Sequence, residues 1–387
     1  MSLNVAGIDN FNPSKKAERK KTMKKIAKTS KIFMSGFVLL SLVLVANLDT
    51  QAAEPLPVDL NTWTAESYPP LSGFLEAAWA VSTDGNSVLQ SINGQPTVFY
   101  SDFEVLDTEV EGTIEVITTG DDDFIGFVLG FQPGDTTNPA ADYLLVDWKR
   151  VEQGYDFPPC TPGSTALAGL AVSRVSGIPT ADEFWGHTNF NISGCSDLDN
   201  GLEELARGTN LGDTGWADNR AYKFAFEYGA TSLKVYVDGN LEIDITGDFS
   251  NGRLAFYNFS QAPVDYNSVV VVVGVEIDIK PGSDPNCFNN DGNGVIPVAI
   301  LGSETFDVNQ IDPYSVTLEG MAVKMVGKAD RALSHIEDVN DDGFDDLVVQ
   351  IQDENGIFEP GIGEAIIMGL LEDGRNFEGS DYICVTQ

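Results

Sequence analysis

The sequence is poor in basic residues, histidine and cysteine, and each shortage excludes a class of function. It has 22 Lys and Arg against 59 Asp and Glu, a formal net charge of −37. A chain of this sign does not bind nucleic acid by neutralising phosphates. It has only two histidines and four cysteines, and neither histidine lies beside a Ser or Cys nucleophile at a recognisable catalytic turn. At 387 residues the chain is long enough for two domains.

The sequence also lacks a long apolar run at its basic N-terminal end. Residues 15–31 carry nine Lys or Arg, and the apolar stretch that follows, Phe33–Ala46, has 14 residues. A membrane-crossing helix needs about 20 apolar residues, so the pattern predicts a secretory signal in residues 1–53. Met23 is an alternative start for a signal of normal length. The predicted mature chain has 13 basic and 56 acidic residues, a difference of −43, which bound cations or high salt would relieve.

The four cysteines fit a protein exported to an oxidising compartment. They divide into two pairs along the chain. Cys160 and Cys195 lie in the first predicted domain, whereas Cys287 and Cys384 lie near the two ends of the second. We therefore predict two disulfide bonds, Cys160 with Cys195 and Cys287 with Cys384.

From Glu54 onward, short runs rich in β-branched and aromatic residues alternate with turn residues, which predicts an all-β sandwich. A short helix is expected at Asp199–Arg207. A long apolar β run, Asn267–Ile279, leads into a change of composition, and we place a domain boundary near Val275, between residues 54–275 and 276–387. The clearest predicted strands are Thr113–Thr118, Phe124–Phe131, Tyr143–Lys149, Ala221–Tyr228, Leu233–Val237, Leu241–Ile245 and Arg253–Phe259.

Three consecutive acids, Asp121, Asp122 and Asp123, lead directly into an apolar predicted strand. Carboxylates this close repel one another unless something neutralises them. Calcium is a direct neutraliser, because it takes six to eight oxygen ligands and loops that end at strands supply them. The alternative is a solvated turn whose acids point into water. Asp142 and Asp147 are possible further ligands.

A second acidic segment, Asp338–Asp346, matches the D-x-N-x-D-G-x-x-D form of a calcium loop. The side chains of Asp338, Asn340 and Asp342 can converge on one ion, Gly343 permits the turn, Phe344 offers its carbonyl, and Asp346 closes the shell. An EF-hand would carry a Glu at the twelfth position, where this chain has Val349, and the flanking residues suggest a strand. The pattern therefore predicts a calcium loop between β elements, with an acidic β-turn as the alternative.

Other polar segments are less specific. Residues 284–294 carry metal-compatible side chains at no fixed spacing, which favours a turn-rich loop. Asp102 and Glu104 share a strand face, but Asp107 has the opposite parity, so a catalytic carboxylate pair is disfavoured. We expect His187 to be a satisfied structural histidine, and predict no enzymatic activity.

Several segments that follow one another in order carry a family resemblance. Together they resemble the C-terminal domain of thrombospondins, a concanavalin A-like jelly-roll β-sandwich, over about residues 60 to 275. The resemblance implies that the acidic run at Asp121–Asp123 contributes to calcium binding. The segment corresponding to the thrombospondin receptor-binding region departs from the animal pattern at Leu145-Val146-Asp147. The segments are Asp121–Gln132, Asp142–Gln153, Phe184–Thr188, Gly215–Tyr222 and Gly252–Gln261.

The C-terminal segment resembles a small β domain of exported bacterial proteins, through Ile277–Asn286, Gly294–Leu301 and Phe377–Ile383. The predicted signal, the two acidic segments and the thrombospondin resemblance together predict a secreted, calcium-binding, non-catalytic protein of cell adhesion or matrix interaction in the extracellular region. A calcium-dependent lectin is the alternative, and a glycoside hydrolase a weaker one. The expected partner is an extracellular protein or glycan, with no nucleic acid and no membrane span in the mature chain.

Overall fold

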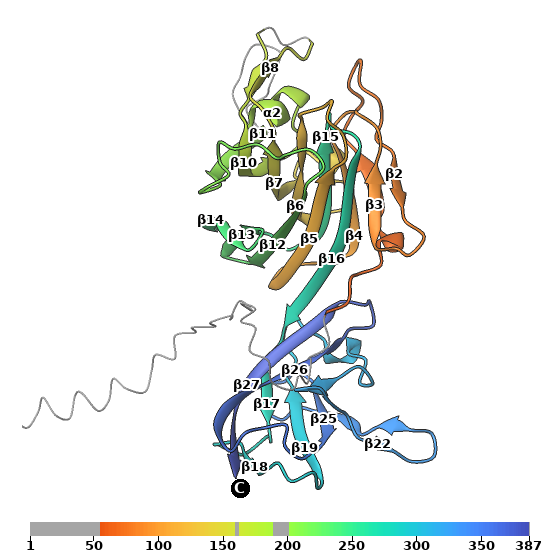
Figure 1. Ribbon diagram of the computed structural model, residues 1–387, viewed down its shortest axis with the longest axis vertical. Helices are drawn as coiled ribbons and strands as arrows, with labels where there is room; N and C mark the ends of the chain where they lie inside the picture. The colour runs from red at the N-terminus through yellow and green to blue at the C-terminus, as the bar shows by residue number, and fades with distance from the viewer. Residues whose placement is uncertain (1–54, 159–161, 189–200, 387) are drawn as a thin grey trace, which may run out of the picture. The chain divides into compact units, whose positions relative to one another are not determined.

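The regular structure of the chain is almost entirely β-strand, as a computed structural model of residues 55–158, 162–188 and 201–386 shows (Figure 1). The predicted all-β class is therefore confirmed. Among these residues no helix has the length and apolar character needed to cross a membrane. The predicted signal, Cys160 and Cys195 lie outside the described residues.

Seven strands form the first large sheet, and its central strands are buried on both faces. In β6, for example, all eight residues are buried, because one face packs on the sandwich core and the other on a second apolar layer. The strand order is β1 (Thr64–Ser67), β4 (Thr97–Glu104), β15 (Arg253–Phe259), β6 (Phe124–Phe131), β7 (Asp142–Lys149), β10 (Gly169–Ser176) and β11 (Gly201–Arg207).

Twelve strands form the second sheet. The order is β14 (Asn240–Thr246), β13 (Ser232–Val237), β12 (Ala221–Gly229), β5 (Thr108–Val116), β16 (Val264–Gly274), β27 (Asn376–Thr386), β26 (Gly361–Leu370), β20 (Thr317–Leu318) and β21 (Met321–Ala322). Beside this path, β18 (Cys287–Asn289) pairs with β27, β3 (Ser87–Gln90) with β16, and β2 (Trp79–Val81) with β3.

The main hydrophobic core lies between these two sheets. Buried and partly exposed residues alternate along β5, which is the period of a strand with one face in a core. The Phe127 ring of β6 lies 5.2 and 4.9 Å from the Phe224 and Phe226 rings of β12, centroid to centroid, and so joins the two layers. The predicted β-sandwich is therefore present.

A second apolar layer covers the other face of the first sheet. It contains Phe124 and Val128 of β6, and Phe184 and Trp185 of the short helix α2 (Ala181–Gly186). The helix begins at a capping box in which Thr180 and Glu183 bond reciprocally. The small hairpin of β8 (Gln153–Tyr155) and β9 (Ser164–Ala166) lies beside it. Three short 3₁₀ helices lie at Leu60–Thr62, Asp135–Thr137 and Val308–Gln310.

The C-terminal part has a hydrophobic cluster of its own, whose members run from Ile277 to Val385. A disulfide joins Cys287 and Cys384 in the neighbouring strands β18 and β27, which is the pair predicted from the sequence. The domain boundary near Val275 stays a prediction. The remaining strands are β17 (Ile277–Ile279), β19 (Val295–Ile300), β25 (Asp346–Gln352) and β24 (Ser334–Glu337), which form a four-stranded sheet, and the pair β22 (Met325–Val326) and β23 (Arg331–Ala332).

Two predicted elements are wrong. Residues 201–207 of the expected helix Asp199–Arg207 form strand β11, because their backbone pairs with β10. The apolar run Asn267–Ile279 is not one strand: β16 ends at Gly274 and β17 begins at Ile277 in another sheet. Asp107, expected to follow Asp102 and Glu104 along one strand with the opposite parity, instead lies between β4 and β5 with a positive φ of 57°.

Candidate functional site, an acidic cluster before strand β6

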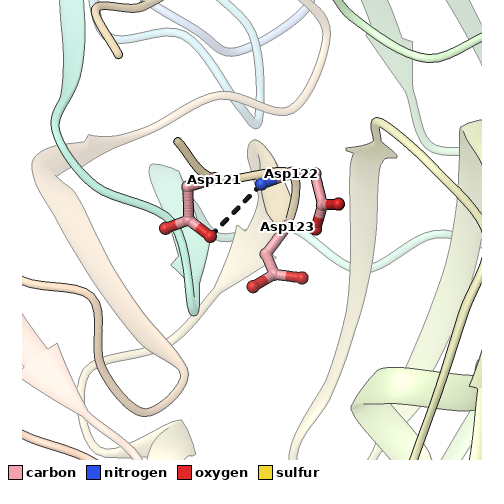
Figure 2. Close-up of side chains that lie close together, drawn as sticks. All are labelled: Asp121, Asp122 and Asp123. Carbon is pink, nitrogen blue, oxygen red and sulfur yellow. Dashed lines mark hydrogen bonds between the residues drawn. The ribbon is translucent and has the colours of Figure 1, made fainter. Parts of the chain in front are cut away.

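Asp121, Asp122 and Asp123 form a cluster where the chain enters β6. Figure 2 shows their side chains on consecutive residues, and one potential ligand atom from each lies within 4.8 Å of the others. In the part of the chain that the structure describes, no other group of three His, Cys, Asp or Glu residues meets this spacing. The cluster borders a pocket of about 520 Å³ that is also lined by Thr119, Gly120, Arg150, Val151 and Gln153.

Loops from distant parts of the sequence hold the cluster in place. Asp121 Oδ2 accepts a hydrogen bond from Asn93 Nδ2 at 2.7 Å. The backbone N–H of Asp123 donates to Oε1 of the fully buried Gln261 at 2.8 Å. The carbonyl of Asp123 accepts from Trp216 Nε1 at 3.1 Å. These bonds connect the Asp121 side chain and the Asp123 backbone to three other segments of the chain.

Lys149 of β7 places its ammonium group inside this cluster. It is fully buried and pairs with Phe124 across the β6–β7 ladder. Its Nζ lies 2.8 Å from Asp123 Oδ1 and 3.3 Å from Asp122 Oδ1, and donates to the Asp122 carbonyl at 2.8 Å. It also lies 5.0 Å from the Trp185 ring centroid. The sequence reasoning missed this residue, which is a cation supplied by the protein itself.

One ammonium group does not neutralise three carboxylates. The neighbouring Arg150 is paired with Asp218, at 2.6 Å, and reaches only the backbone carbonyl of Asp121. Burial and the charge of Asp123 raise the pKa of Asp121 to about 6. Burial also raises the pKa of Asp123, and Lys149 offsets only part of this effect. The cluster therefore keeps excess negative charge at neutral pH.

The residues present fit a hard cation. Lys149 contacts only the Oδ1 atoms of Asp122 and Asp123. The Asp123 carboxylate is also bonded by the Ser260 side chain, so the Oδ2 atom of Asp122 is the one left for a further ligand. Carboxylate oxygens are what Ca²⁺ prefers, and a bound cation would relieve the repulsion that raises these pKa values. Asp142 and Asp147 are engaged elsewhere: Asp142 pairs with Arg174 at 2.5 Å, and Asp147 lies 3.0 Å from His187.

The second predicted metal loop, residues 338–346, joins β24 to β25, as the strand-like flank predicts. Its acids fold back on their own backbone. Asp338 accepts from the N–H of Asp342 and Gly343 at 3.2 and 3.0 Å, and Asp342 accepts from Phe344 N–H at 2.9 Å. These are turn-forming hydrogen bonds; Asp342, Gly343 and Phe344 are exposed, and Asp338 is half-buried.

Asp346 differs from the rest of this loop. It is fully buried, and its two carboxylate oxygens accept from Gly302 N–H and Val339 N–H, both at 2.9 Å. Asn340 Oδ1 accepts from Asp342 N–H at 3.0 Å. Among the described residues, the structure thus brings Asp121, Asp122 and Asp123 together as a three-carboxylate group, but not Asp338, Asp342 and Asp346. The calcium assignment of both loops remains a prediction.

His187 is buried in a charged group of its own. Its Nε2 lies 3.0 Å from Asp147 Oδ2 and its Nδ1 3.3 Å from Glu204 Oε2, while Arg207 holds Glu204 at 2.9 Å. Burial alone would lower the pKa of His187, but the two carboxylates outweigh it and raise the value to about 9. His187 is thus satisfied by its partners, in the way expected of a structural histidine.

Comparison with known proteins places the sandwich in a family. The model of the thrombospondin C-terminal region matches residues 75–273, which is half of the chain. The chain belongs to the thrombospondin C-terminal family. The match begins before β2 and ends in β16, so this thrombospondin C-terminal region contains the cluster at Asp121–Asp123 and excludes the loop at residues 338–346.

Individual relatives agree with this placement. The chain is 26% identical to human cartilage oligomeric matrix protein over 203 residues, 48% of this chain and 24% of that protein. It is 26% identical to thrombospondin-3b of Danio rerio over 207 residues, 50% of this chain and 21% of that protein. The matched part is therefore less than a quarter of the length of these relatives.

Solved structures show more distant likenesses. The carbohydrate-binding module CBM66 from Bacillus subtilis is 13% identical, with a TM-score of 0.34, and the match covers 54% of this chain and 94% of that one. The exoplasmic/lumenal domain of VIP36, in its Ca²⁺/Man3GlcNAc-bound form, is 14% identical, with a TM-score of 0.33, covering 56% and 86%. At these TM-scores the likenesses carry no functional argument.

Proposed function

We propose that the chain is a secreted calcium-binding protein of adhesion or matrix interaction, without catalytic activity, in which Ca²⁺ braces acidic loops. The observation that carries the proposal is the excess negative charge of Asp121–Asp123 beside a pocket, in a member of the thrombospondin C-terminal family. Asp122 would offer its Oδ2 atom, and Asp121 and Asp123 would each add a carboxylate oxygen.

The metal would act by neutralisation. It would cancel carboxylate repulsion and tie the entrance of β6 to the loops that hold Asn93 and Gln261. Because the metal would bind only the folded chain, stability would rise with calcium concentration, by about 2.7 kcal/mol at 100 times the dissociation constant. The braced loops would then present a fixed surface to a partner, because the loops that bind a partner are usually the least stable part of such a module.

The loop at residues 338–346 is proposed as a second calcium loop, through Asp338, Asn340, Asp342, the Phe344 carbonyl and Asp346. Its sequence pattern supports this. Asp346 already accepts from two backbone amides, so it would close the shell through water while Asp338 and Asp342 meet the ion directly. The segment 276–387 is proposed as a separate small β domain of the kind found in exported bacterial proteins, and the signal in residues 1–53 as the route of export.

Calorimetric titration of Ca²⁺ into the chelator-stripped chain tests the proposal. We expect saturable binding that loses one site in Asp121→Asn/Asp122→Asn and another in Asp338→Asn/Asp342→Asn. Asp244→Asn is the matched control, because Asp244 is an exposed acid of β14 outside both loops. If the unsubstituted chain gives no saturable heat, neither loop binds calcium and the proposal is wrong.

A calcium-dependent lectin is a second candidate, favoured by one observation. Tyr155 is 41% exposed and lies on β8, two residues from Gln153, which lines the acidic pocket. An exposed aromatic ring beside polar groups is the usual arrangement for sugar stacking. A glycan array that gives a specific signal, lost with chelator and in Tyr155→Ala, would support this candidate over a purely protein-directed adhesion role.

A further inference from the structure

The first half of strand β26 is an open edge of its sheet. At its far end β26 pairs with β20, through Ile367 and Met368. Ile366 is the last residue covered on this side: its carbonyl accepts from Glu319 N–H, and its N–H donates to the Glu319 carboxylate, at 2.9 and 2.8 Å. Among the described residues, no strand pairs with β26 on this side between Gly361 and Ala365.

The hydrogen-bonding direction of the open residues follows from this. Both backbone groups of Ile366 point away from β27, and the direction alternates along an antiparallel strand with period two. The β26–β27 register is unbroken from Gly361 to Leu370. The N–H and C=O groups of Glu364 and Ile362 therefore also point outward, and they present four hydrogen-bonding groups to an added strand.

The side chains around this edge determine which side chains of an added strand would fit beside them. Ile362 is 88% exposed and Ile366 38% exposed, and both lie on the same strand face as Glu364. Tyr382 of β27, 70% exposed, lies opposite Glu364 and extends the apolar patch. The face therefore reads apolar, acidic, apolar at every second residue.

The opposite face of the edge leaves room for the added strand. It presents Gly361 and Gly363, which have no side chains, and the surroundings of Gly363 hold only an Ile383 methylene at contact distance. The carboxylate of Glu364 is held by Ser380 at 2.7 Å, so it stays on the open face. Between residues 334 and 387 the chain has 14 acids against one basic residue, Arg375, which disfavours a second copy of this chain and favours a basic occupant.

We propose that the edge of β26 at Gly361–Ile366 binds an extended segment of a partner protein by β-strand addition, and that this segment carries apolar, basic and apolar side chains at alternate positions. The basic side chain would lie beside Glu364, and the apolar ones beside Ile362 and Ile366. Main-chain hydrogen bonds give affinity in this binding mode, and alternate side chains give specificity. The site is independent of the calcium loops.

The probe is a fluorescent peptide, Thr-Val-Thr-Lys-Thr-Val-Thr, acetylated and amidated, with a second peptide that has Glu in place of Lys. Fluorescence anisotropy with the purified, oxidised chain, in chelator and about 0.15 M salt, measures both. We expect saturable binding that is tighter for the Lys peptide by ~2- to 5-fold, the range of one cross-strand charge pair. Chelator keeps the outcome separate from that of the calcium proposal.

Two variants test the geometry. Glu364→Pro removes an outward N–H without breaking a bond to β27 and should abolish binding of both peptides, whereas Glu364→Lys keeps the N–H and should reverse the preference toward the Glu peptide. Unchanged far-ultraviolet circular dichroism and melting show that each variant folds.

Three binding results would each overturn the proposal: equal binding of both peptides, binding that survives Glu364→Pro, or no binding at all. So would sedimentation that shows a dimer dissociated by Glu364→Pro, because a second copy would then be the occupant.

Discussion

Replacing Lys149 with methionine removes the ammonium group from the acidic cluster and leaves the rest of the side chain in place. The expected loss of stability comes mainly from the ion pair with Asp123, whose side chain is only 8% exposed. The side chain of Asp122 is 39% exposed, so water screens its ion pair with Lys149. Leaving a buried charge without its partner costs about 3 to 5 kcal/mol, and the screened pair adds at most about 1 kcal/mol. Proton uptake by Asp123 relieves part of this cost. Methionine fills the space of the lysine stem but loses the ammonium contact with the Trp185 ring, and we expect a loss of about 3 kcal/mol at pH 7.

Urea unfolding followed by tryptophan fluorescence, in chelator, measures this loss. Lys223→Met is the matched control: its ammonium lies 2.7 Å from Glu111, but both side chains are largely exposed, at 57% and 41%. Such a pair contributes less than about 1 kcal/mol. If the two variants lose the same stability, the buried ammonium is not neutralising the cluster and the electrostatic reasoning fails.

The same variant bears on calcium. Without Lys149, the only cation of the protein that lines the pocket among the described residues is Arg150, which is already paired with Asp218. Ca²⁺ should therefore bind Lys149→Met more tightly than the unsubstituted chain and restore part of its lost stability. Affinity that is unchanged or weaker would place the metal away from this cluster.

Three further outcomes follow from the contacts described. The pKa of His187 is raised from 6.5 to about 9 beside Asp147. The charged histidine therefore contributes about 3 kcal/mol to the free energy of unfolding below pH 6.5, and this contribution is lost as pH rises through 9. The urea midpoint should fall over that range in the unsubstituted chain and not in His187→Gln. Gly126→Ala should lower the free energy of unfolding, measured by thermal unfolding, by at least about 2 to 3 kcal/mol, because a Cβ there would lie 2.2 Å from the backbone carbonyl oxygen of Val146 in β7. Cys287→Ala/Cys384→Ala should lower unfolding free energy by about 3 to 5 kcal/mol, the value for closing a 97-residue loop; an unchanged urea midpoint would contradict it.

The strands could be predicted from the sequence where composition and turn residues agree. Strands β6 and β15 begin and end as predicted, because their aromatic and aliphatic runs lie between turn residues: Asp123 and Pro133 for β6, Gly252 and Ser260 for β15. The helix expected at residues 199–207 is wrong for residues 201–207. Leu202, Leu205 and Ala206 have helical spacing, but the backbone of this segment pairs with β10 and therefore forms a strand. Helix α2 was missed, although Thr180 and Glu183 already stand at the spacing of a capping box.

The candidate site was predictable only in its acidic half. Three adjacent acids are visible in the sequence, but the cation that faces them comes from the β6–β7 register, which sets Phe124 opposite Lys149. The register between two strands joined by a ten-residue connection, residues 132–141, follows from tertiary packing, which no local pattern records. For the same reason the partners of His187 were not predictable, since Asp147 and Glu204 come from β7 and β11.

The Cys287–Cys384 bond has a consequence that bears on the proposed secretion, because proteases act outside the cell. It closes a covalent ring around most of the C-terminal hydrophobic cluster, including Val298, Val349 and Ile367. A single cut in an exposed loop inside that ring leaves both fragments joined. Nicked chains should therefore keep their full mass on a non-reducing gel and fall into two bands only after reduction, so that damage to a loop need not release the part of the core on either side of it.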